Sequence, residues 1–248
     1  MLFSIFIQYH HQHPRPEGTG MLVPIGMDLM KLKYLGLIFD LDGTLVDTLE
    51  DIAASMNRAL SHRGFPELPS DEFREKVGWG IKRLAFLSLP EEARNEETAA
   101  LVAADAAAFY ADNPLVSSRP YPGILELISA LKLKKIKTAV LTNKPDPVAH
   151  KVIAGLFSPG SFDMVRGEIF GGIRKPDPAC VWEILVELDL MPASIIFMGD
   201  SEIDMETAVS SGCFPLGVSW GYRPTEIINK AGARRIIDKP EELMDFFN

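Results

Sequence analysis

The stretch Leu35-Gly36-Leu37-Ile38-Phe39-Asp40-Leu41-Asp42-Gly43-Thr44 decides the fold of this chain. Its first five residues form an apolar run, which is typical of a strand buried on both faces of a parallel sheet. The run ends abruptly at two aspartates. Similar apolar runs recur at residues 137–141, 194–198 and 213–218, and each of them also ends in polar residues.

Helical patterns fill the gaps between these runs. They cover residues 123–133, 147–156, 178–188 and 202–211, and prolines and glycines mark several of their ends. Strands that alternate with helices predict a parallel sheet with helices on both faces, which is a doubly wound α/β fold.

The alternation stops between residues 48 and 118. Ile52, Met56 and Leu60 follow helical spacing, and Thr48 with Asp51 could form a capping box. Further helical segments are expected at about residues 70–76, 80–88 and 91–111. We therefore predict an inserted all-helical domain at 48–118, within a Rossmann-like core made of 34–47 and 119–248.

The first 33 residues do not follow this pattern. The apolar run at residues 1–7 lacks a basic segment before it and leads into His10, His11 and His13, so it does not resemble a signal peptide. We interpret 1–33 as a disordered or misassigned extension. No run of about 18 apolar residues predicts a membrane span, and we expect a cytoplasmic protein.

Composition and charge narrow the class of partner. The 248 residues can bury a substantial core, and 47% of them are hydrophobic. A formal net charge of -9 argues against a surface for nucleic acid or anionic lipid. An anionic substrate would therefore need a local positive site. Cys180 and Cys213 are expected to be buried thiols without a disulfide.

Acidic residues follow two of the predicted strands. Asp40 and Asp42 stand two apart after the first strand, and Asp200 and Asp204 lie at helical spacing after a later one. Carboxylates held close together are costly unless a cation lies between them, and Mg²⁺ prefers such oxygen ligands. Taken alone, Asp200 could be a plain helix N-cap and Asp204 a first-turn acid. A calcium loop is excluded, because Thr44 and Asp51 occupy positions at which that motif needs other ligands.

Two further polar sites could bind phosphate. Thr142 and Asn143 offer a hydroxyl and an amide at the end of a third strand. Lys175 precedes Pro176-Asp177-Pro178, whose prolines restrict the backbone, although a lone lysine is usually solvated surface. Because ligands of open α/β sheets bind beyond the carboxyl ends of the strands, these residues are candidates for one site.

The sequence resembles the haloacid dehalogenase-like phosphatases at four ordered runs: Phe39-Asp40-Leu41-Asp42-Gly43-Thr44-Leu45, Leu141-Thr142-Asn143-Lys144-Pro145, Arg174-Lys175-Pro176-Asp177-Pro178 and Gly199-Asp200-Ser201-Glu202-Ile203-Asp204. Each stands at its expected strand end, and the resemblance covers about residues 34 to 247. Within this superfamily, Tyr121-Pro122-Gly123, Val77-Gly78-Trp79-Gly80 and Ser219-Trp220-Gly221-Tyr222 are most similar to phosphoglycolate phosphatase and its close relatives.

This resemblance implies a mechanism. Asp40 would be the nucleophile, and Asp42 the general acid and base. Thr142 and Lys175 would hold the transferring phosphoryl group, while Gly43, Thr44 and Asn143 would contact the substrate. Mg²⁺ would be bound by Asp40, by the backbone carbonyl of Asp42, by Asp200 and by Asp204.

The resemblance also implies that the helical insert is a cap over the site, where it excludes water and selects the substrate. Gly78 and Gly80 would allow close approach, and Lys82 or Arg83 could meet a substrate carboxylate or phosphate. The alternative is that Lys82 and Arg83 lie on the wet face of a helix.

Several functions stay open at this point. The expected one is Mg²⁺-dependent hydrolysis of a small phosphorylated metabolite, most similar to phosphoglycolate phosphatase. A phosphomutase of the β-phosphoglucomutase type, a pyrophosphatase, a nucleotidase and a catalytically silent binding protein are alternatives. Dehalogenase chemistry is disfavoured, because it needs neither an acid at Asp42 nor a metal cluster. The sequence allows a monomer or a homodimer.

Overall fold

The computed structural model describes residues 34–169 and 172–247, so the extension predicted at 1–33 lies outside the described residues. Its main element is a six-stranded sheet with the strand order β5-β4-β1-β6-β7-β8, in which every neighbouring pair is parallel. The strands are β1 (Gly36–Phe39), β4 (Lys137–Pro145), β5 (Met164–Glu168), β6 (Ile195–Gly199), β7 (Phe214–Val218) and β8 (Arg235–Ile237). The predicted α/β fold class is confirmed.

The strands that the apolar runs did not predict are the two edges of the sheet. Most residues of β5 are half-buried, and β8 is only three residues long. An edge strand packs against fewer neighbours than a central one, so its sequence carries a weaker apolar signal. Strand β4 also runs past the predicted end at Leu141 to Pro145, with a change of register between those two residues.

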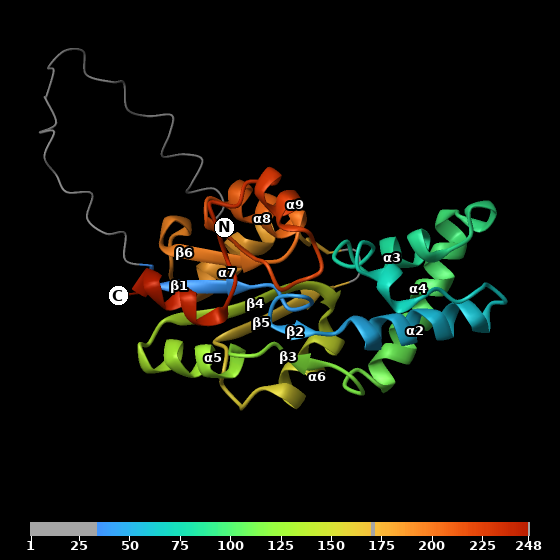
Figure 1. Cartoon of the computed structure of the whole chain (residues 1–248), viewed down its shortest axis with the longest axis horizontal. Helices are drawn as coiled ribbons and strands as arrows, with labels where there is room; N and C mark the ends of the chain where they lie inside the picture. Colours follow the sequence, from blue (N-terminus) through green and yellow to red (C-terminus); the bar gives the residue numbers. More distant parts are fainter. Residues whose placement is uncertain (1–33, 170–171, 248) are drawn as a thin grey trace, which may run out of the picture. The chain divides into compact units, whose positions relative to one another are not determined.

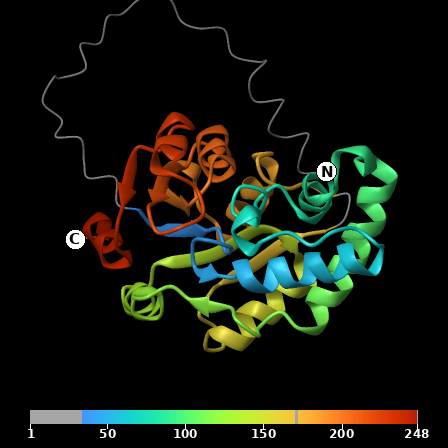
Figure 2. The same cartoon turned by 45° about the vertical axis from the view of Figure 1, so that its right-hand side comes forward.

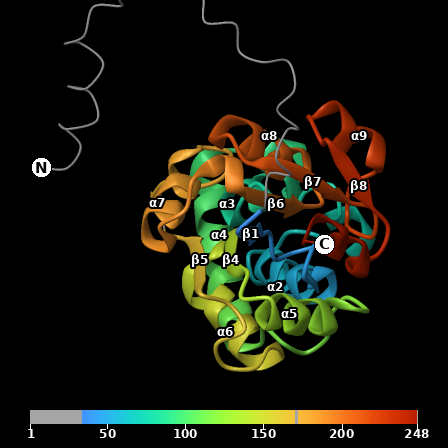
Figure 3. The same cartoon turned by 90° about the vertical axis from the view of Figure 1, so that its left-hand side faces the viewer.

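Helices cover both faces of the sheet: α5 (Ile124–Leu133), α6 (Asp146–Leu156), α7 (Ala179–Leu188), α8 (Glu202–Ser211) and α9 (Thr225–Lys230). Short 3₁₀ turns occur at η3 (Pro192–Ser194) and η4 (Pro240–Phe247). Leu37 and Phe39 pack on the α5 and α6 side, whereas Ile38 packs on the side of α7. Figure 3 shows α5 and α6 on one side of the strands and α7 and α8 on the other. The alternating direction of side chains along β1 therefore supplies both halves of the core.

The segment between β1 and the rest of the sheet is helical, as predicted. It contains α2 (Leu49–His62), η1 (Ser70–Phe73), α3 (Ile81–Ser88), η2 (Glu91–Ala93) and α4 (Glu96–Asp112). Helices α2, α3 and α4 lie together beyond one end of the strands (Figure 1, Figure 2). We call this segment, residues 48–118, the insert. That it forms a separate domain stays a prediction.

The two connections to the insert lie side by side. Strands β2 (Val46–Asp47) and β3 (Arg119–Pro120) pair antiparallel at its base. The capping box predicted for Thr48 and Asp51 does not form. Instead, both Asp51 carboxylate oxygens accept hydrogen bonds from Ser117 and Ser118, at 2.6 to 3.1 Å. Asp51 is 4% exposed, so this long-range contact prevails over the local cap and fixes where the chain leaves the insert.

Two expectations about the rest of the chain can be compared with the described residues. Cys180 and Cys213 are buried free thiols, as predicted. Among residues 34–169 and 172–247, no helix is long and apolar enough to cross a membrane.

Replacing Asp51 should destabilise the protein. Asp51→Ala removes an acceptor shared by two backbone amides and one hydroxyl. A hydrogen bond to a charged group contributes about 1.5 to 3 kcal/mol to the free energy of unfolding. We expect urea unfolding to show a loss of about 2 to 4 kcal/mol. Glu50→Ala removes an exposed acid that bonds the Ser70 hydroxyl and should cost under about 1 kcal/mol. Equal losses for the two variants would contradict this role.

Candidate active site

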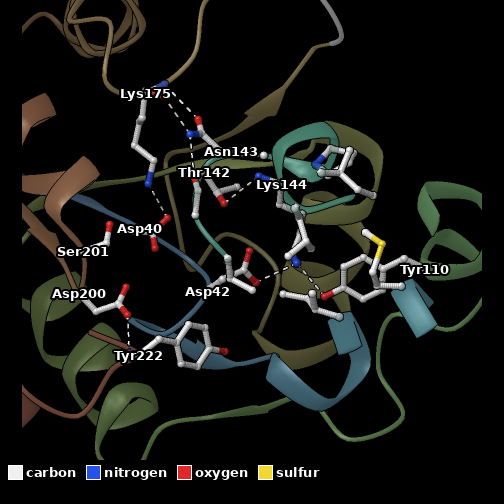
Figure 4. Close-up of a pocket in the computed structure, with 18 of the residues that line it drawn as sticks. Asp40, Asp42, Tyr110, Thr142, Asn143, Lys144, Lys175, Asp200, Ser201 and Tyr222 are labelled. Atoms are coloured by element: carbon white, nitrogen blue, oxygen red, sulfur yellow. Dashed lines mark hydrogen bonds and ion pairs between the residues drawn. The ribbon is translucent and has the colours of Figure 1, made fainter. Parts of the chain in front are cut away.

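The carboxyl ends of the central strands carry most of the predicted site residues. Asp40 follows β1, Thr142 and Asn143 lie in β4, and Asp200 follows β6. Because β4 and β6 are the two neighbours of β1, these side chains are brought to the same edge of the sheet. Lys175 reaches this edge from the loop between β5 and α7 (Figure 4).

Three carboxylates form a buried cluster. Oxygens of Asp40, Asp200 and Asp204 lie within 4.8 Å of one another, and none of these residues is more than 6% exposed. Burial raises the pKa of Asp40 well above its ordinary value, and the neighbouring acids add to this shift while Lys175 opposes it. Burial, followed by repulsion from Asp204, raises the pKa of Asp200 to about 7. The cluster thus carries more negative charge than its surroundings compensate.

Lys175 is the cation in direct contact with this cluster. Its Nζ donates hydrogen bonds to Asp40 Oδ1 at 2.6 Å and to Asp204 Oδ1 at 2.7 Å. Burial lowers the pKa of Lys175, but the carboxylates of Asp204 and Asp40 more than reverse this effect and raise it above its ordinary value. Lys175 therefore stays charged, and the prediction that it meets Asp40 agrees with the geometry.

Local contacts fix the orientation of Asp200. Its Oδ2 accepts a hydrogen bond from the Tyr222 amide at 2.7 Å, and its Oδ1 accepts one from the Thr44 hydroxyl at 3.3 Å. Gly43 has a φ of 85°, and a Cβ at that position would lie 2.4 Å from Asp200 Oδ2. Gly43 and Thr44, predicted to contact substrate, therefore contact this acid and do not line the cavity.

Asp204 is held by a capping box at the start of α8. Its Oδ2 accepts hydrogen bonds from the Ser201 amide at 3.1 Å and from the Ser201 hydroxyl at 2.6 Å. Its Oδ1 accepts from Lys175. Both oxygens of Asp204 already have strong donors, whereas Asp40 Oδ2 has no hydrogen-bond partner among the described residues.

The cluster fits a hard divalent cation. Its donors are all carboxylate oxygens, which Mg²⁺ prefers, and its excess negative charge is what such an ion would neutralise. Asp40 has one oxygen without a hydrogen-bond partner among the described residues, and the Asp200 Oδ1 has only a long bond of 3.3 Å from Thr44, while Asp204 is held by Lys175 and Ser201. Asp42 was predicted to reach the metal through its backbone carbonyl, and its carboxylate is not part of this cluster.

The Asp42 carboxylate is held apart from the cluster by a second lysine. Lys144 Nζ lies 2.8 Å from Asp42 Oδ1, and the Thr48 hydroxyl donates to the same oxygen at 2.5 Å. Lys144 also donates to the hydroxyl of Tyr110, on α4 of the insert, at 2.7 Å. Figure 4 shows Lys144 between Asp42 and Tyr110.

Asn143 and Thr142, both in β4, make different contacts. The Asn143 amide donates to the backbone carbonyls of Gly78 and Lys175 at 2.9 and 3.0 Å, and its oxygen accepts from the Lys175 amide. Asn143 thereby ties the lysine loop to the insert. The Thr142 hydroxyl accepts from the Lys144 amide and faces the cavity, where it can donate to a ligand.

These residues surround a cavity of about 60 Å³ between the sheet edge and the insert. This is small compared with the roughly 300 Å³ or more of most ligand pockets, so the site suits a small ligand. The insert contributes an apolar roof together with the backbone of Gly78 and Gly80 and the ring of Tyr110. Its apolar members are Ile52, Met56, Val77, Ile81, Leu84 and Ala106.

Lys82 and Arg83 do not line this cavity. Lys82 pairs with Glu96 at 2.7 Å, and the Arg83 guanidinium stacks on the Phe86 ring at 5.2 Å. The structure therefore places both side chains on the outer face of α3, as the alternative interpretation expected.

Core side chains hold the loop at residues 74–80 of the insert. The buried Arg223 guanidinium donates to the backbone carbonyls of Arg74, Glu75 and Val77 and pairs with Glu202. Arg174 donates to the Trp79 carbonyl at 3.1 Å. These contacts close one side of the cavity.

Some residues that line the cavity were not predicted: Tyr110, Lys144, Ser201, Tyr222 and Arg223. Lys144, Ser201 and Tyr222 stand inside the runs that carry the family resemblance, so their positions held a signal. Tyr110 and Arg223 had none, because nothing in their local sequence indicates that they meet the site across the fold.

Comparison with known proteins shows which family the chain belongs to. A model of the family of haloacid dehalogenase-like hydrolases matches residues 37–218. The chain is 32% identical to phosphoglycolate phosphatase of Aquifex aeolicus over 186 residues, which are 75% of this chain and 85% of that protein. It is 33% identical to phosphoglycolate phosphatase of Rhodospirillum rubrum over 218 residues, covering 85% and 89% of the two chains.

A solved structure is also similar. The crystal structure of a predicted phosphoglycolate phosphatase from Haemophilus somnus superposes with a TM-score of 0.79 at 27% identity, covering 87% of this chain and 99% of that one. These matches extend over most of each chain. The chain therefore belongs to the haloacid dehalogenase-like hydrolase family. Within that family it is an enzyme of the phosphatase class, which confirms the predicted class.

The acid cluster should link magnesium binding to pH. A raised pKa in the fold means that the folded protein binds protons more tightly than the unfolded chain, whose aspartates titrate near 3.9. Without metal, stability should therefore fall as the pH rises from about 4 to 7. Because a bound cation offsets this repulsion, the rise in melting temperature caused by Mg²⁺ should be larger at about pH 8 than at about pH 5.5.

Thermal unfolding in EDTA and in magnesium chloride at the two pH values checks this prediction. Asp200→Asn should remove most of the pH-dependent difference. Asp71→Asn, which changes an 88% exposed acid, should leave it unchanged. The same magnesium effect at both pH values in the unsubstituted protein would contradict the assignment of the cluster.

Proposed function

We propose that this protein is a Mg²⁺-dependent phosphatase that hydrolyses a small phosphorylated metabolite through an aspartyl-phosphate on Asp40. The observation that carries the proposal is the convergence of Asp40, Lys175 and Asp200 at one end of a cavity. The family membership supports the same chemistry.

The first step would transfer the phosphoryl group to the enzyme. An oxygen of Asp40 attacks phosphorus while the bond from phosphorus to the ester oxygen breaks, and Asp42 gives its proton to that leaving oxygen. In the second step Asp42 takes a proton from water as the water oxygen attacks phosphorus, which releases phosphate and restores Asp40. This division replaces one difficult displacement by two easier ones.

The remaining groups would reduce the charge conflict between a carboxylate and an anionic ester. Lys175 already contacts Asp40 and would also meet phosphoryl oxygens, and Thr142 would donate from its hydroxyl. When bound by Asp40 and Asp200, Mg²⁺ supplies positive charge at the transferring group. Asp42 Oδ2 has no hydrogen-bond partner among the described residues, which suits it to exchange protons with the substrate.

We propose 2-phosphoglycolate as the first substrate to test. The relatives that match along most of their length bear the name phosphoglycolate phosphatase, and the small cavity favours a metabolite of this size. The roof of the cavity offers few polar groups, so the phosphoryl group rather than the remainder of the ester would provide most of the binding.

Removing the nucleophile tests the mechanism. Asp40→Asn keeps the shape of the side chain but cannot form an aspartyl-phosphate, so we expect turnover of p-nitrophenyl phosphate with Mg²⁺ to fall by at least about 10³-fold. Asp71→Asn should retain the original rate, because the Asp71 side chain is 88% exposed to solvent. Full activity in Asp40→Asn, or in the unsubstituted protein after thorough chelation, would overturn the proposal.

A screen of phosphorylated metabolites would identify the substrate. The screen compares specificity constants for 2-phosphoglycolate, hexose phosphates, nucleoside monophosphates and pyrophosphate. The specificity constant should be highest for a small monophosphate. Product analysis with a hexose phosphate separates a hydrolase, which releases phosphate, from a mutase, which returns the phosphoryl group to the sugar.

A further inference from the structure

The mechanism above leaves one buried ion pair of the cavity unexplained. The Lys144 side chain is 2% exposed, yet it plays no part in phosphoryl transfer as written. Its Nζ lies 2.8 Å from Asp42 Oδ1 and 2.7 Å from the Tyr110 hydroxyl oxygen. A buried ammonium that loses its partner is costly, so both contacts are held firmly.

The contacts of Asp42 are all on one of its oxygens. Lys144 and the Thr48 hydroxyl both reach Oδ1, while Oδ2 has no donor among the described residues. No side-chain polar atom of the described residues is both buried and unpartnered, so Oδ2 is exposed to the cavity, which Asp42 lines. Lys144 therefore fixes the carboxylate by its inner oxygen and leaves the outer one for proton transfer.

Tyr110 brings the insert into this arrangement. It lies on α4, is 4% exposed, and its hydroxyl accepts the hydrogen bond from Lys144. Burial raises the pKa of Tyr110 to about 12, so the hydroxyl keeps its proton and does not compete with Asp42 for the charge of Lys144. When the insert is against the core, Tyr110 thus supplies a neutral second partner that sets the direction of the ammonium group.

We propose that Lys144 is a positioning residue for Asp42, and that Tyr110 makes this positioning depend on the insert. The inference rests on the proposed function, because it concerns the acid and base of that reaction. It predicts that the link between Tyr110, Lys144 and Asp42 acts on protonation of the leaving group and not on binding of the phosphoryl group.

Leaving groups of different basicity test the proposal. An alkoxide needs a proton as it departs, whereas p-nitrophenolate leaves with little help. Lys144→Met should therefore lower kcat for 2-phosphoglycolate by about 10²-fold and for p-nitrophenyl phosphate by under about ten-fold. Tyr110→Phe removes only the hydroxyl. It should lower kcat for 2-phosphoglycolate by roughly ten-fold and kcat for p-nitrophenyl phosphate by less. KM should change little for either substrate.

The matched control is Lys151→Met. Lys151 donates to the carbonyl of Ala111, next to Tyr110 on α4, but it lies outside the cavity and does not reach Asp42. The Lys151→Met variant should keep the original ratio of kcat for 2-phosphoglycolate to kcat for p-nitrophenyl phosphate. If 2-phosphoglycolate is a poor substrate, glycerol 2-phosphate takes its place.

Equal losses for the two leaving groups, or no loss in Lys144→Met and Tyr110→Phe, would overturn the proposal. Tyr110→Phe preserves the ring and decides the question if Lys144→Met fails to fold, which thermal unfolding shows. A failure of the proposed function is seen separately, because Asp40→Asn would then keep the activity of the unsubstituted protein.

Discussion

The structure depends on the contact between Lys175 and two buried carboxylates. Its ammonium group lies 2.6 Å from Asp40 and 2.7 Å from Asp204. Asp200 adds a third carboxylate to the cluster. Burial of like charges is tolerated only where cations and directed donors offset it. The Tyr222 amide and the Ser201 hydroxyl supply such donors, and the remaining charge defines the place for a divalent ion.

The insert is held over this cluster by polar contacts to its backbone. Asn143, Arg174 and Arg223 all donate to carbonyls of the loop at residues 74–80. Two positions of the loop also require glycine: Gly78 and Gly80 have φ of 114° and 83°, and a Cβ at Gly80 would lie 2.6 Å from the Arg174 guanidinium. The roof itself is apolar, which keeps water away from the acids and strengthens every electrostatic interaction beneath it.

The sequence predicted the center of this arrangement better than its periphery. The apolar run before Asp40 has a strong signal because β1 is buried on both faces, whereas the half-buried edge strand β5 has little signal and was not predicted. Thr48 and Asp51 were expected to cap a helix together. Instead, the Thr48 hydroxyl donates to Asp42, and Asp51 accepts from Ser118. Lys82 and Arg83 were predicted to face the substrate, and helix α3 is turned so that they face outward.

By itself the sequence determined the doubly wound fold and the helical insert, because periodicity is a local property of the chain. The position of Asp40, Thr142 and Asp200 after apolar runs, together with the family resemblance, singled out these residues and Lys175 as site candidates. Only the tertiary structure decided that Asp42 pairs with Lys144 instead of joining the acid cluster, and that Tyr110 and Arg223 reach the cavity. Those contacts join residues from 34 to 149 positions apart or depend on how the insert sits on the core. No local sequence pattern encodes such contacts, because they result from the packing of whole helices and strands.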